Sequence, residues 1–317
     1  MDTQAIRDQF GHLAESIKSR IVGQPELIDH LLTGFACGGH LLMEGLPGLA
    51  KTTIVRLLAQ GLGLPFGRVQ MTPDIMPGDI LGSSLLKPDL SGFLFQPGPI
   101  FTTILLVDEL NRAPAKVQSA LLEAMQEGQV TLAGQPHALG PLFWVVATQN
   151  PIDQEGTYPL AESQKDRFLM RLTVSYPETS AESELLSSPG EPLDNPIPPM
   201  AFKPDELSNL RKHIPTIHCE PLLVDWVAKV IQATRQPSLI GLTDKVLWGV
   251  SPRGGRMWLK SARAHAWWSG RDFVLPADLR ALANAALNHR IVSDWSSTRS
   301  DSQVSLVTRI MDKIGPP

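Results

Sequence analysis

Over the first half of the chain, short runs of apolar residues alternate with stretches in which apolar residues recur every three or four positions. Continuous apolar runs are typical of buried strands, and this recurrence is typical of amphipathic helices. The runs predict strands at 40–43, 66–72, 104–109, 143–148 and 169–174. The recurrence predicts helices at 6–21, 26–35, 54–59 and 115–126. Strands and helices in this order indicate an α/β domain built on a parallel sheet.

The second half of the chain has a different pattern. Residues 177–200 are rich in Ser, Pro, Glu and Asn, which indicates a closing helix followed by a linker. Helical spacing then continues, with predicted helices that begin near residues 204, 221, 255 and 276. We therefore expect an α/β core over residues 1–198 and a smaller all-α domain over residues 199–317.

Two segments of the core fit neither pattern. Residues 92–101 combine aromatic residues with turn-forming Gly and Pro, as in an extended surface insertion. Residues 130–137 have the pattern of a β-hairpin around a Gly-containing turn. The sequence leaves the role of both segments open.

Residues 43–53, between the first predicted strand and its helix, have the features of a phosphate-binding loop. Backbone N–H groups at a helix start, helped by the helix dipole, bind phosphate. Lys51 would reach the β- and γ-phosphates, and the Thr52 hydroxyl would ligate Mg²⁺. The strict pattern has glycine in place of Ala50, so we expect Ala50 to keep φ negative while Gly45 and Gly48 supply the unusual angles. The alternative is an ordinary strand–turn–helix corner. The predicted nucleotide contacts are Gly45, Gly48, Leu49, Ala50, Lys51, Thr52 and Thr53.

Polar side chains follow two of the predicted strands. Asp108 and Glu109 end the third strand, and Asn150 follows the fourth. The carboxyl ends of parallel strands meet at the ligand-binding edge of an open sheet. Asp108 would hold Mg²⁺ together with Thr52, Glu109 would act as the general base on the attacking water, and Asn150 would bind that water or the γ-phosphate. The alternatives are a strand that ends at charged residues on reaching the surface, and a turn-forming Asn before proline.

Further candidates lie outside these strands. Val22 and Gly23, in the turn before the second helix, would line the adenine pocket. Arg167, before the last strand, would reach the γ-phosphate held by a neighbouring subunit, unless it forms an ion pair within its own chain. Arg253 opens a helix, where its charge is unfavourable relative to the dipole, so a bound anion would relieve it and Arg253 would reach back to the nucleotide. Arg256 competes for that role, and solvent exposure is the alternative for both.

Composition narrows the classes of function. The chain has 317 residues, 43% of them hydrophobic and 19% charged, with a net charge of −4 and a pI of about 6.1. This balance argues against a general nucleic-acid binder. Cys37 and Cys219 are far apart and fit packed thiols better than a disulfide or metal ligands. Without a signal-peptide pattern or an apolar run of membrane-spanning length, we expect a cytoplasmic protein.

These residues together resemble the MoxR family of AAA+ ATPases over nearly the whole chain, most specifically in the block 147–170. Small departures occur at Val250 and Gly254, where alanine is usual, and at Ala161 and Lys165 before Arg167. The stretches that carry the resemblance are IVGQ at 21–24, EGLPGLAKT at 44–52, RVQMTPD at 68–74, DELNRAPAK at 108–116, QSALLEAMQE at 118–127, ATQNPIDQEGTYPL at 147–160, DRFLM at 166–170 and SPR at 251–253.

The resemblance implies an AAA+ P-loop αβα core with a helical lid, assembled as a homo-oligomeric ring for which a hexamer is expected. It also implies ATP and Mg²⁺ as cofactors, a client protein remodelled in a chaperone-like manner, and a partner with a von Willebrand A domain. Nucleic acid and a membrane span are not expected. By resemblance, Lys51 and Thr52 belong to Walker A and Asp108 and Glu109 to Walker B, with Asn150 as sensor 1, Arg167 as the arginine finger and Arg253 as sensor 2.

Two other functions compete with an ATP-driven remodelling ring. A DNA-translocating AAA+ motor would use the same hairpin, but residues 130–142 contain no Lys or Arg to bind phosphates. A nucleotide-gated scaffold with negligible turnover would not need Glu109 and Asn150. Salt-dependent DNA binding would support the first alternative, and negligible turnover at ring-forming concentrations would support the second.

Overall fold

We describe a computed structural model of the chain, over residues 3–86, 93–132, 134–151, 156–187, 192–200, 202–242, 246–293 and 304–317. Several predicted segments extend beyond these ranges. Residue 92 of the insertion, residue 133 of the hairpin, residues 152–155 of the block typical of the family, and residues 188–191 of the linker lie outside the described residues.

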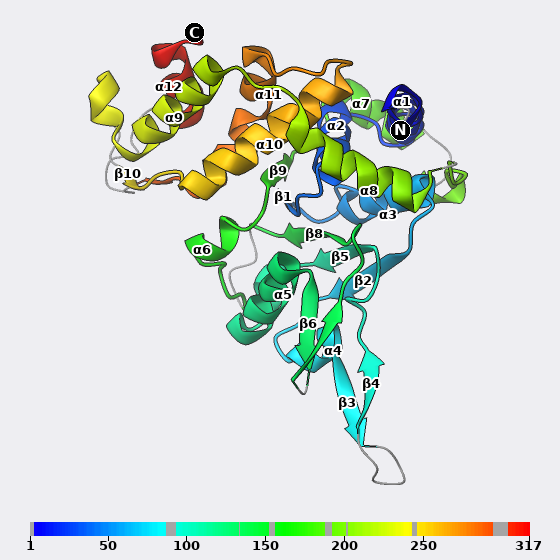
Figure 1. Cartoon of the computed structure of the whole chain (residues 1–317). Helices are drawn as coiled ribbons and strands as arrows, with labels where there is room; N and C mark the ends of the chain where they lie inside the picture. The colour runs from blue at the N-terminus through cyan, green and yellow to red at the C-terminus, as the bar shows by residue number, and fades with distance from the viewer. Residues whose placement is uncertain are drawn as a thin grey trace.

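A five-stranded sheet forms the centre of the molecule, in the order β2-β5-β8-β1-β9 (Figure 1). All neighbouring strands in it are parallel. The strands are β1 (Leu41–Gly45), β2 (Phe66–Gln70), β5 (Ile104–Asp108), β8 (Trp144–Gln149) and β9 (Met170–Val174). Each coincides with one of the predicted apolar runs, so the prediction of an α/β core with a parallel sheet is confirmed.

Helices cover both faces of the sheet, because alternate residues of the central strands β1, β5 and β8 enter two different hydrophobic cores. In β5, Ile104 and Leu106 belong to the larger core, whereas Leu105 and Val107 belong to the smaller one. The four long helices of the core, α1, α2, α3 and α5, lie where the helical spacing predicts them. The larger core is covered by α1 (Thr3–Lys18), α2 (Pro25–Ala36) and α3 (Lys51–Leu62), and the smaller by α4 (Pro77–Leu81) and α5 (Ala115–Glu127).

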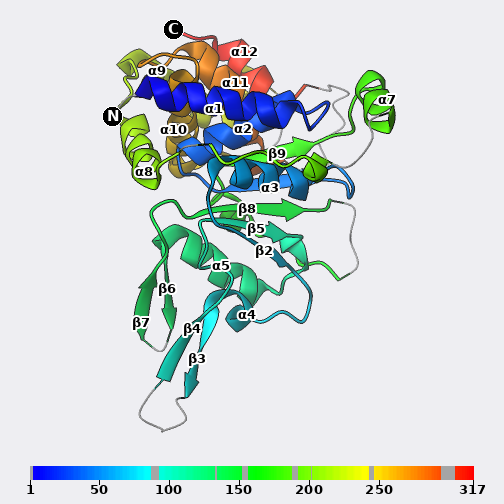
Figure 2. The same cartoon turned by 90° about the vertical axis from the view of Figure 1, so that its right-hand side faces the viewer.

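Two antiparallel hairpins project away from the helical half of the chain (Figure 2). As predicted, β6 (Gln129–Leu132) pairs with β7 (Gln135–Ala138). β4 (Phe93–Pro97) pairs with β3 (Gly82–Leu86), which the sequence pattern does not predict because it begins with Gly-Ser-Ser and lacks an apolar run. The rings of Phe95 and His137 stack with 3.8 Å between their centroids, so the two hairpins touch.

The second half of the chain is mainly helical, as predicted. Helix α12 (Leu306–Ile314) and a two-stranded sheet of β10 (Val246–Trp248) and β11 (Val292–Ser293) are additional to the prediction. No helix within the described ranges is long and apolar enough to cross a membrane. Cys37 and Cys219 are free thiols, as expected. Two short helices, α6 (Glu162–Lys165) and α7 (Thr179–Ser187), come before the predicted linker, and the helices after it are α8 (Pro204–His213), α9 (Pro221–Arg235), α10 (Pro252–Trp268), α11 (Pro276–Leu287) and α12.

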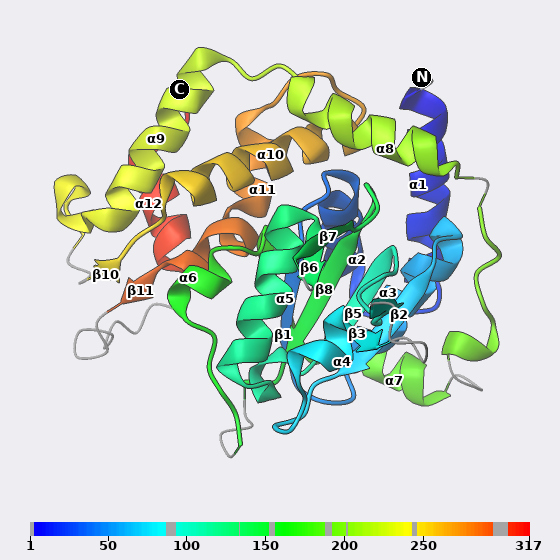
Figure 3. The same cartoon turned by 60° about the horizontal axis from the view of Figure 1, so that its bottom comes forward.

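The helical half packs against α1 and α2 through a continuous hydrophobic core (Figure 3). Phe10 of α1 lies at the centre of this contact. Its ring meets those of Phe202, Trp267 and Trp268 edge-on, at centroid distances of 5.1, 5.6 and 6.0 Å. Such aromatic contacts add to the free energy gained by burial, so the first helix and the helical half stabilise each other. The domain boundary between residues 198 and 199 stays a prediction.

Candidate active site

The loop between β1 and α3 reverses tightly. Gly48 has a φ of 81°, as expected, but Ala50 also adopts a left-handed conformation, with a φ of 55°. The expectation that Ala50 keeps φ negative is therefore wrong, because the chain has to turn immediately before Lys51, the first residue of α3. A non-glycine residue in this conformation stores about 1–2 kcal/mol of backbone strain.

Gly45 is needed for a different reason from the one expected. Its φ lies outside the positive range that Gly48 adopts. A Cβ at Gly45 would lie 2.7 Å from the carbonyl oxygen of Val174 on β9, so only glycine allows the two strands to pack this closely. The start of the loop is thereby fixed against the neighbouring strand.

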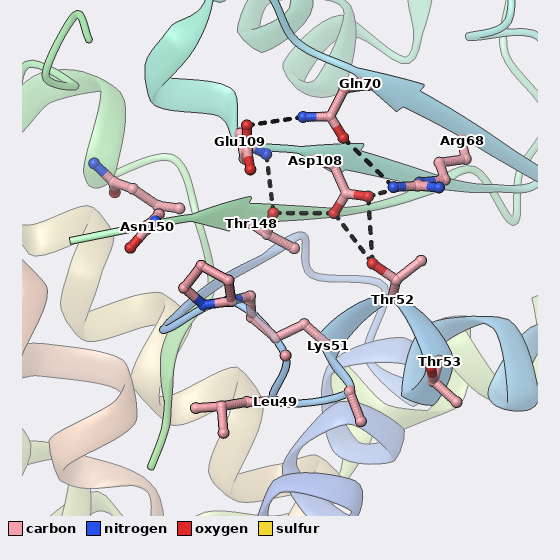
Figure 4. Close-up of a pocket in the computed structure, with 14 residues that line it drawn as sticks. Leu49, Lys51, Thr52, Thr53, Arg68, Gln70, Asp108, Glu109, Thr148 and Asn150 are labelled. Carbon is pink, nitrogen blue, oxygen red and sulfur yellow. Dashed lines mark hydrogen bonds and ion pairs between the residues drawn. The ribbon is translucent and has the colours of Figure 1, made fainter. Parts of the chain in front are cut away.

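Lys51 and Thr52, the first two residues of α3, bring a cation and a hydroxyl to the loop (Figure 4). The Lys51 ammonium donates to the carbonyl oxygen of Leu46 at 2.7 Å. Burial lowers the pKa of Lys51, whereas Asp108 and Glu109 raise it and so favour its charged form. The Thr52 hydroxyl lies 3.3 and 3.5 Å from the two carboxylate oxygens of Asp108. A hydroxyl and a buried carboxylate are oxygen ligands of the kind that Mg²⁺ prefers.

Glu109 follows β5 in a left-handed conformation, with a φ of 57°. Its backbone N–H donates to the hydroxyl of Thr148 at 2.9 Å, and that hydroxyl donates to Asp108 Oδ1 at 3.1 Å. The Glu109 carboxylate accepts from Gln70 Nε2 at 2.9 Å and from Arg112 Nη1 at 3.1 Å, both on Oε2. Strain of this kind persists only where neighbouring groups enforce it. Hydrogen bonds to the Thr148 hydroxyl thus fix both the backbone of Glu109 and the carboxylate of Asp108.

Apart from Arg112, the side chains just described line one cavity of about 360 Å³, called the loop cavity below. Asn150 is 6% exposed, and its backbone carbonyl accepts from Asn111 Nδ2 at 3.3 Å, which fixes the end of β8 at the wall of this cavity. Of the predicted residues, the loop cavity brings together Gly48, Leu49, Ala50, Lys51, Thr52, Thr53, Asp108, Glu109 and Asn150.

A second cavity, of about 300 Å³ and lined mainly by apolar side chains, adjoins the loop cavity. Residues 47–50 form part of the wall of both. Val22 lines the second cavity, together with Ile21 and Tyr176. Gly23 does not line it but lines a different cavity, with His30 and Arg171; its φ is 83°, and a Cβ there would lie 2.9 Å from Pro177 Cβ. An apolar cleft beside a phosphate loop suits a flat organic base.

The two predicted arginines lie in a third cavity, of about 410 Å³, called the arginine cavity below. Lys260 and His40 also line it. Arg167 donates to the Leu122 carbonyl at 3.4 Å and to the side-chain oxygen of Gln126. Among the residues that the structure describes, no acid forms an ion pair with Arg167, so the intrachain ion pair considered from the sequence is not found.

The expectation that Arg253 reaches back to the nucleotide of its own chain is not met. Arg253 lies in the first turn of α10, and α10 packs on α2 and α11 rather than over the loop. It therefore lines the arginine cavity instead of the loop cavity. Arg256, the competing candidate, is exposed to solvent and lines neither of these two cavities.

The sequence pattern does not identify four side chains of the loop cavity and its surroundings. Besides Gln70, Arg112 and Thr148, the site contains Arg68, whose Nε donates to Asp108 Oδ2 at 2.7 Å. Arg68 and Gln70 are two residues apart in β2 and so share a face of the sheet. Polar residues at this spacing in a predicted strand are a usable signal. This spacing identifies a site only once the pairing of β2 with β5 is known. That pairing places Gln70 opposite Asp108.

Comparison with known proteins agrees with this geometry. The ATPase family associated with various cellular activities matches residues 40–170, and the AAA lid domain matches residues 243–310. Chaperone MoxR1 of Mycobacterium tuberculosis is 38% identical over 95% of this chain and 80% of its own length. Protein MoxR of Paracoccus denitrificans is 30% identical over 89% of this chain and 88% of its own.

A solved structure shows the same fold. The crystal structure of a candidate ATPase from Cytophaga hutchinsonii superposes with a TM-score of 0.89 at 36% identity, covering 99% of this chain and 97% of that one. Both halves of the present chain are included in this match. With the MoxR relatives at 30–38% identity and the two AAA domains in order, the chain belongs to the MoxR family of AAA+ ATPases.

Proposed function

We propose that the chain binds ATP with Mg²⁺ and hydrolyses it. The observation that carries this proposal is the meeting of Lys51, Thr52, Asp108 and Glu109 in one cavity, at the carboxyl edge of a parallel sheet. The Lys51 cation and the loop N–H groups suit a phosphate chain. The apolar cavity at Val22, which shares a wall with the loop cavity, suits the adenine base.

The donors present fit a magnesium ion. Thr52 and Asp108 would hold it, since their oxygens lie 3.3 Å apart at the closest and both belong to the loop cavity. When bound, Mg²⁺ neutralises charge on the β- and γ-phosphate oxygens. Arg68 and Thr148 donate to the Asp108 carboxylate and so keep it turned toward Thr52.

Glu109 is the side chain best placed to act on water. Its carboxylate is held by Gln70 and Arg112, separately from the pair of Thr52 and Asp108. It would accept a proton from the water that attacks the γ-phosphorus, while the bond to the bridging oxygen of ADP breaks. Asn150, at the wall of the same cavity, would orient that water.

The placement of Arg167 and Arg253 supports an active site shared between copies. Both line the arginine cavity and not the loop cavity of their own chain, so they would be available to a nucleotide held by a neighbouring copy. In a closed ring every copy would offer both arginines to its neighbour, so that each site is completed in the same way. We propose such a ring, with a hexamer as the expected state.

We further propose that this ring remodels or matures a client protein. One relative carries the name chaperone, and hydrolysis in a ring provides a cycle of shape changes that could act on a bound protein. The partner with a von Willebrand A domain and the cytoplasmic location remain expectations from the sequence.

Two substitutions test the proposal directly. Lys51→Ala and Glu109→Gln should each lower ATP turnover by about 10²-fold or more, because one removes the phosphate-binding cation and the other the general base. Glu109→Gln should still bind ATP. Glu123→Gln, an exposed acid on α5, is the matched control and should keep full turnover. Undiminished hydrolysis in both site variants would overturn the proposal.

The two alternatives considered from the sequence have less support. A DNA motor would need cations on the β6–β7 hairpin, which carries no Lys or Arg, and the ring of His137 is stacked on Phe95. A scaffold without turnover would not need Glu109 to be held by two side chains beside the phosphate loop. Strong salt-dependent DNA binding, or negligible turnover at ring-forming concentrations, would reverse this order.

A further inference from the structure

Arg290, in the short turn after α11, holds its guanidinium almost entirely out of water, with the side chain 1% exposed. A buried arginine needs a partner for its charge and acceptors for its N–H groups. Most of these acceptors belong to the segment that carries Arg167. They are the backbone carbonyls of Asp166, Phe168, Leu169 and Ala286, with the thioether of Met257.

The charge of Arg290 is matched by Asp166, the residue directly before Arg167. Nε of Arg290 donates to Asp166 Oδ1 at 2.7 Å. The same carboxylate accepts the hydroxyl of Ser251, at 3.0 Å to Oδ2 and 3.3 Å to Oδ1. One carboxylate in the α/β core is therefore bonded to two separate elements of the helical half.

Ser251 continues this connection to the helix that carries Arg253. It is the N-cap of α10, and its hydroxyl accepts the backbone N–H of Gly254 at 3.0 Å. The Ser251 hydroxyl thus caps the N-terminus of α10 and also donates to Asp166. Because Arg253 follows Ser251 by two residues, and Arg167 follows Asp166 directly, a short chain of bonds joins the two arginines.

Glycine at position 254 fits the same arrangement. A Cβ there would lie 2.6 Å from Cδ of Arg290 and 2.9 Å from its Nε. A larger residue would displace the buried side chain from its acceptors. The departure from the alanine usual in the family is thereby explained by the path of Arg290.

We propose that Asp166 is a positioning residue which, with Arg290 and Ser251, holds Arg167 and Arg253 as one unit so that both reach the nucleotide of the neighbouring copy together. This inference rests on the proposed function, because it assigns Arg167 to a neighbour's active site. A carboxylate is required at 166, since an amide would leave Arg290 with no negative partner in the described part of the chain.

Subunit mixing distinguishes a positioning role from damage to the fold. An Asp166→Asn chain keeps its own Lys51 and Glu109 but offers a misplaced Arg167 to the next copy. A Glu109→Gln chain has the opposite defect. Each alone should hydrolyse ATP at least about tenfold more slowly than the unsubstituted protein, and Asp166→Asn should bind an ATP analogue normally.

In an equal mixture of these two variants, about one quarter of the interfaces pair an intact pocket with an intact arginine. Turnover should recover to about one quarter of the unsubstituted level, well above either variant alone. If the mixture gives only the average of the two variants, Asp166→Asn has damaged its own pocket or fold, and the positioning role is wrong.

Asp278→Asn is the matched control. Asp278 is a buried carboxylate within the helical half that accepts from Arg271 at 2.7 Å and from His265 at 2.6 Å. Its bonds resemble those of Asp166 but lead to no arginine of the arginine cavity. Asp278→Asn should keep near-full turnover, and a loss as large as that of Asp166→Asn would contradict the inference.

A parallel mixture of Arg167→Ala with Glu109→Gln tests the shared active site itself. If it stays inactive, the proposed ring mechanism and this inference both fail. If it recovers while the Asp166→Asn mixture does not, only the positioning role fails. Should Asp166→Asn not fold, Ser251→Ala removes one donor from the same carboxylate. Its turnover should fall to about one third, and an equal mixture with Glu109→Gln should stay at about one third, because the intact arginines of the added subunits offset the dilution. An unchanged turnover of the variant, or a mixture that falls to the average of about one sixth, overturns the inference.

Discussion

The loop cavity and the arginine cavity are built in opposite ways. The loop cavity is formed by one contiguous turn before α3 and by the ends of β2, β5 and β8, which are consecutive strands of one sheet. The arginine cavity draws on Arg167 and Arg253, which are 86 residues apart (253 − 167), and on bonds across the junction of core and lid. Residues close together in the sequence therefore form most of the loop cavity, whereas contacts between distant segments form the arginine cavity.

This difference in construction suggests that the loop cavity binds the nucleotide, whereas the arginine cavity affects the rate at which a neighbouring copy hydrolyses it. Residues of the loop cavity would act within one chain, so an intact neighbouring copy should not repair their loss. Residues of the arginine cavity would act only where two copies meet, so their effects should depend on assembly. The following predictions test that separation.

Arg167→Ala should have the largest effect of the arginine cavity. An arginine supplied by a neighbouring copy stabilises charge in the transition state, and its loss should lower turnover by about 10³-fold or more. ATP binding, measured with a fluorescent analogue, should remain unchanged. Loss of binding as well would place Arg167 at the nucleotide of its own chain and remove the distinction between the two cavities.

Lys260→Ala should have a smaller effect of the same kind. Lys260 lines the arginine cavity from α10, two turns beyond Arg253, and adds a third cation to it. Removing it should lower turnover by about tenfold, equivalent to about 1.4 kcal/mol of the activation barrier. Lys229→Ala, which removes an exposed lysine of α9, is the control and should leave turnover unchanged. Equal effects of both would show that only the general charge of the helical half matters.

Thr148→Val tests how the loop cavity holds its two acids. The substitution leaves the Glu109 N–H without its acceptor and removes a donor to Asp108, which should lower the free energy of unfolding by about 1–3 kcal/mol and turnover as well. Thr234→Val is the matched control, because Thr234 is also buried and its hydroxyl also accepts one backbone N–H, that of Val250, while it donates to the carbonyl of Ile231. Urea unfolding should show a similar loss for both variants, with turnover reduced only for Thr148→Val.

His40 should make the wall of the arginine cavity sensitive to acid. Burial lowers the pKa of His40 to about 4, and its Nδ1 accepts the N–H of Val145 while Nε2 donates to Met125. Between pH of about 6.5 and about 4 the unfolded chain binds a proton that the folded chain does not, so the free energy of unfolding falls as pH falls. His40→Gln should flatten this decline, whereas His12→Gln, at an exposed position, should not.

Ala50→Gly should give the smallest change. It relieves a left-handed alanine and should raise the free energy of unfolding by about 1 kcal/mol, as measured by chemical denaturation. Gly48→Ala is the opposite case: no atom lies within 4 Å of the new Cβ, so only backbone strain would act, with a loss of about 1 kcal/mol. No gain from Ala50→Gly would mean that bonds around the loop fully compensate the strain.

The sheet and the loop cavity could be predicted because their signals are local. The central strands of the sheet are apolar runs. Asp108 ends one of them, Asn150 follows another closely, and the loop that leads to Lys51 follows a third. The prediction for Ala50 was wrong for a local reason too, since residue type states a preference for φ and not its value. Strand β3 gives no signal because it begins with small polar residues and pairs only within a two-stranded hairpin.

The arginine cavity could be predicted only in part. The residue types at Arg167 and Arg253 suggest anion contacts, but the sequence does not show that α10 packs on α2 and so faces away from the loop. The bond between Asp166 and Arg290 joins residues 124 positions apart. No periodicity or spacing rule relates such residues, because their proximity is created by the docking of the helical half.

The place of Phe10 has a practical consequence for work on this protein. A shortened chain that starts after residue 18 would lack the ring that fills the space between Phe202, Trp267 and Trp268. Those large aromatic surfaces would then face water, and such chains would tend to associate through them. Deletion of the first helix would therefore produce aggregates instead of a shorter folded protein, so affinity tags should be added ahead of this helix rather than in its place.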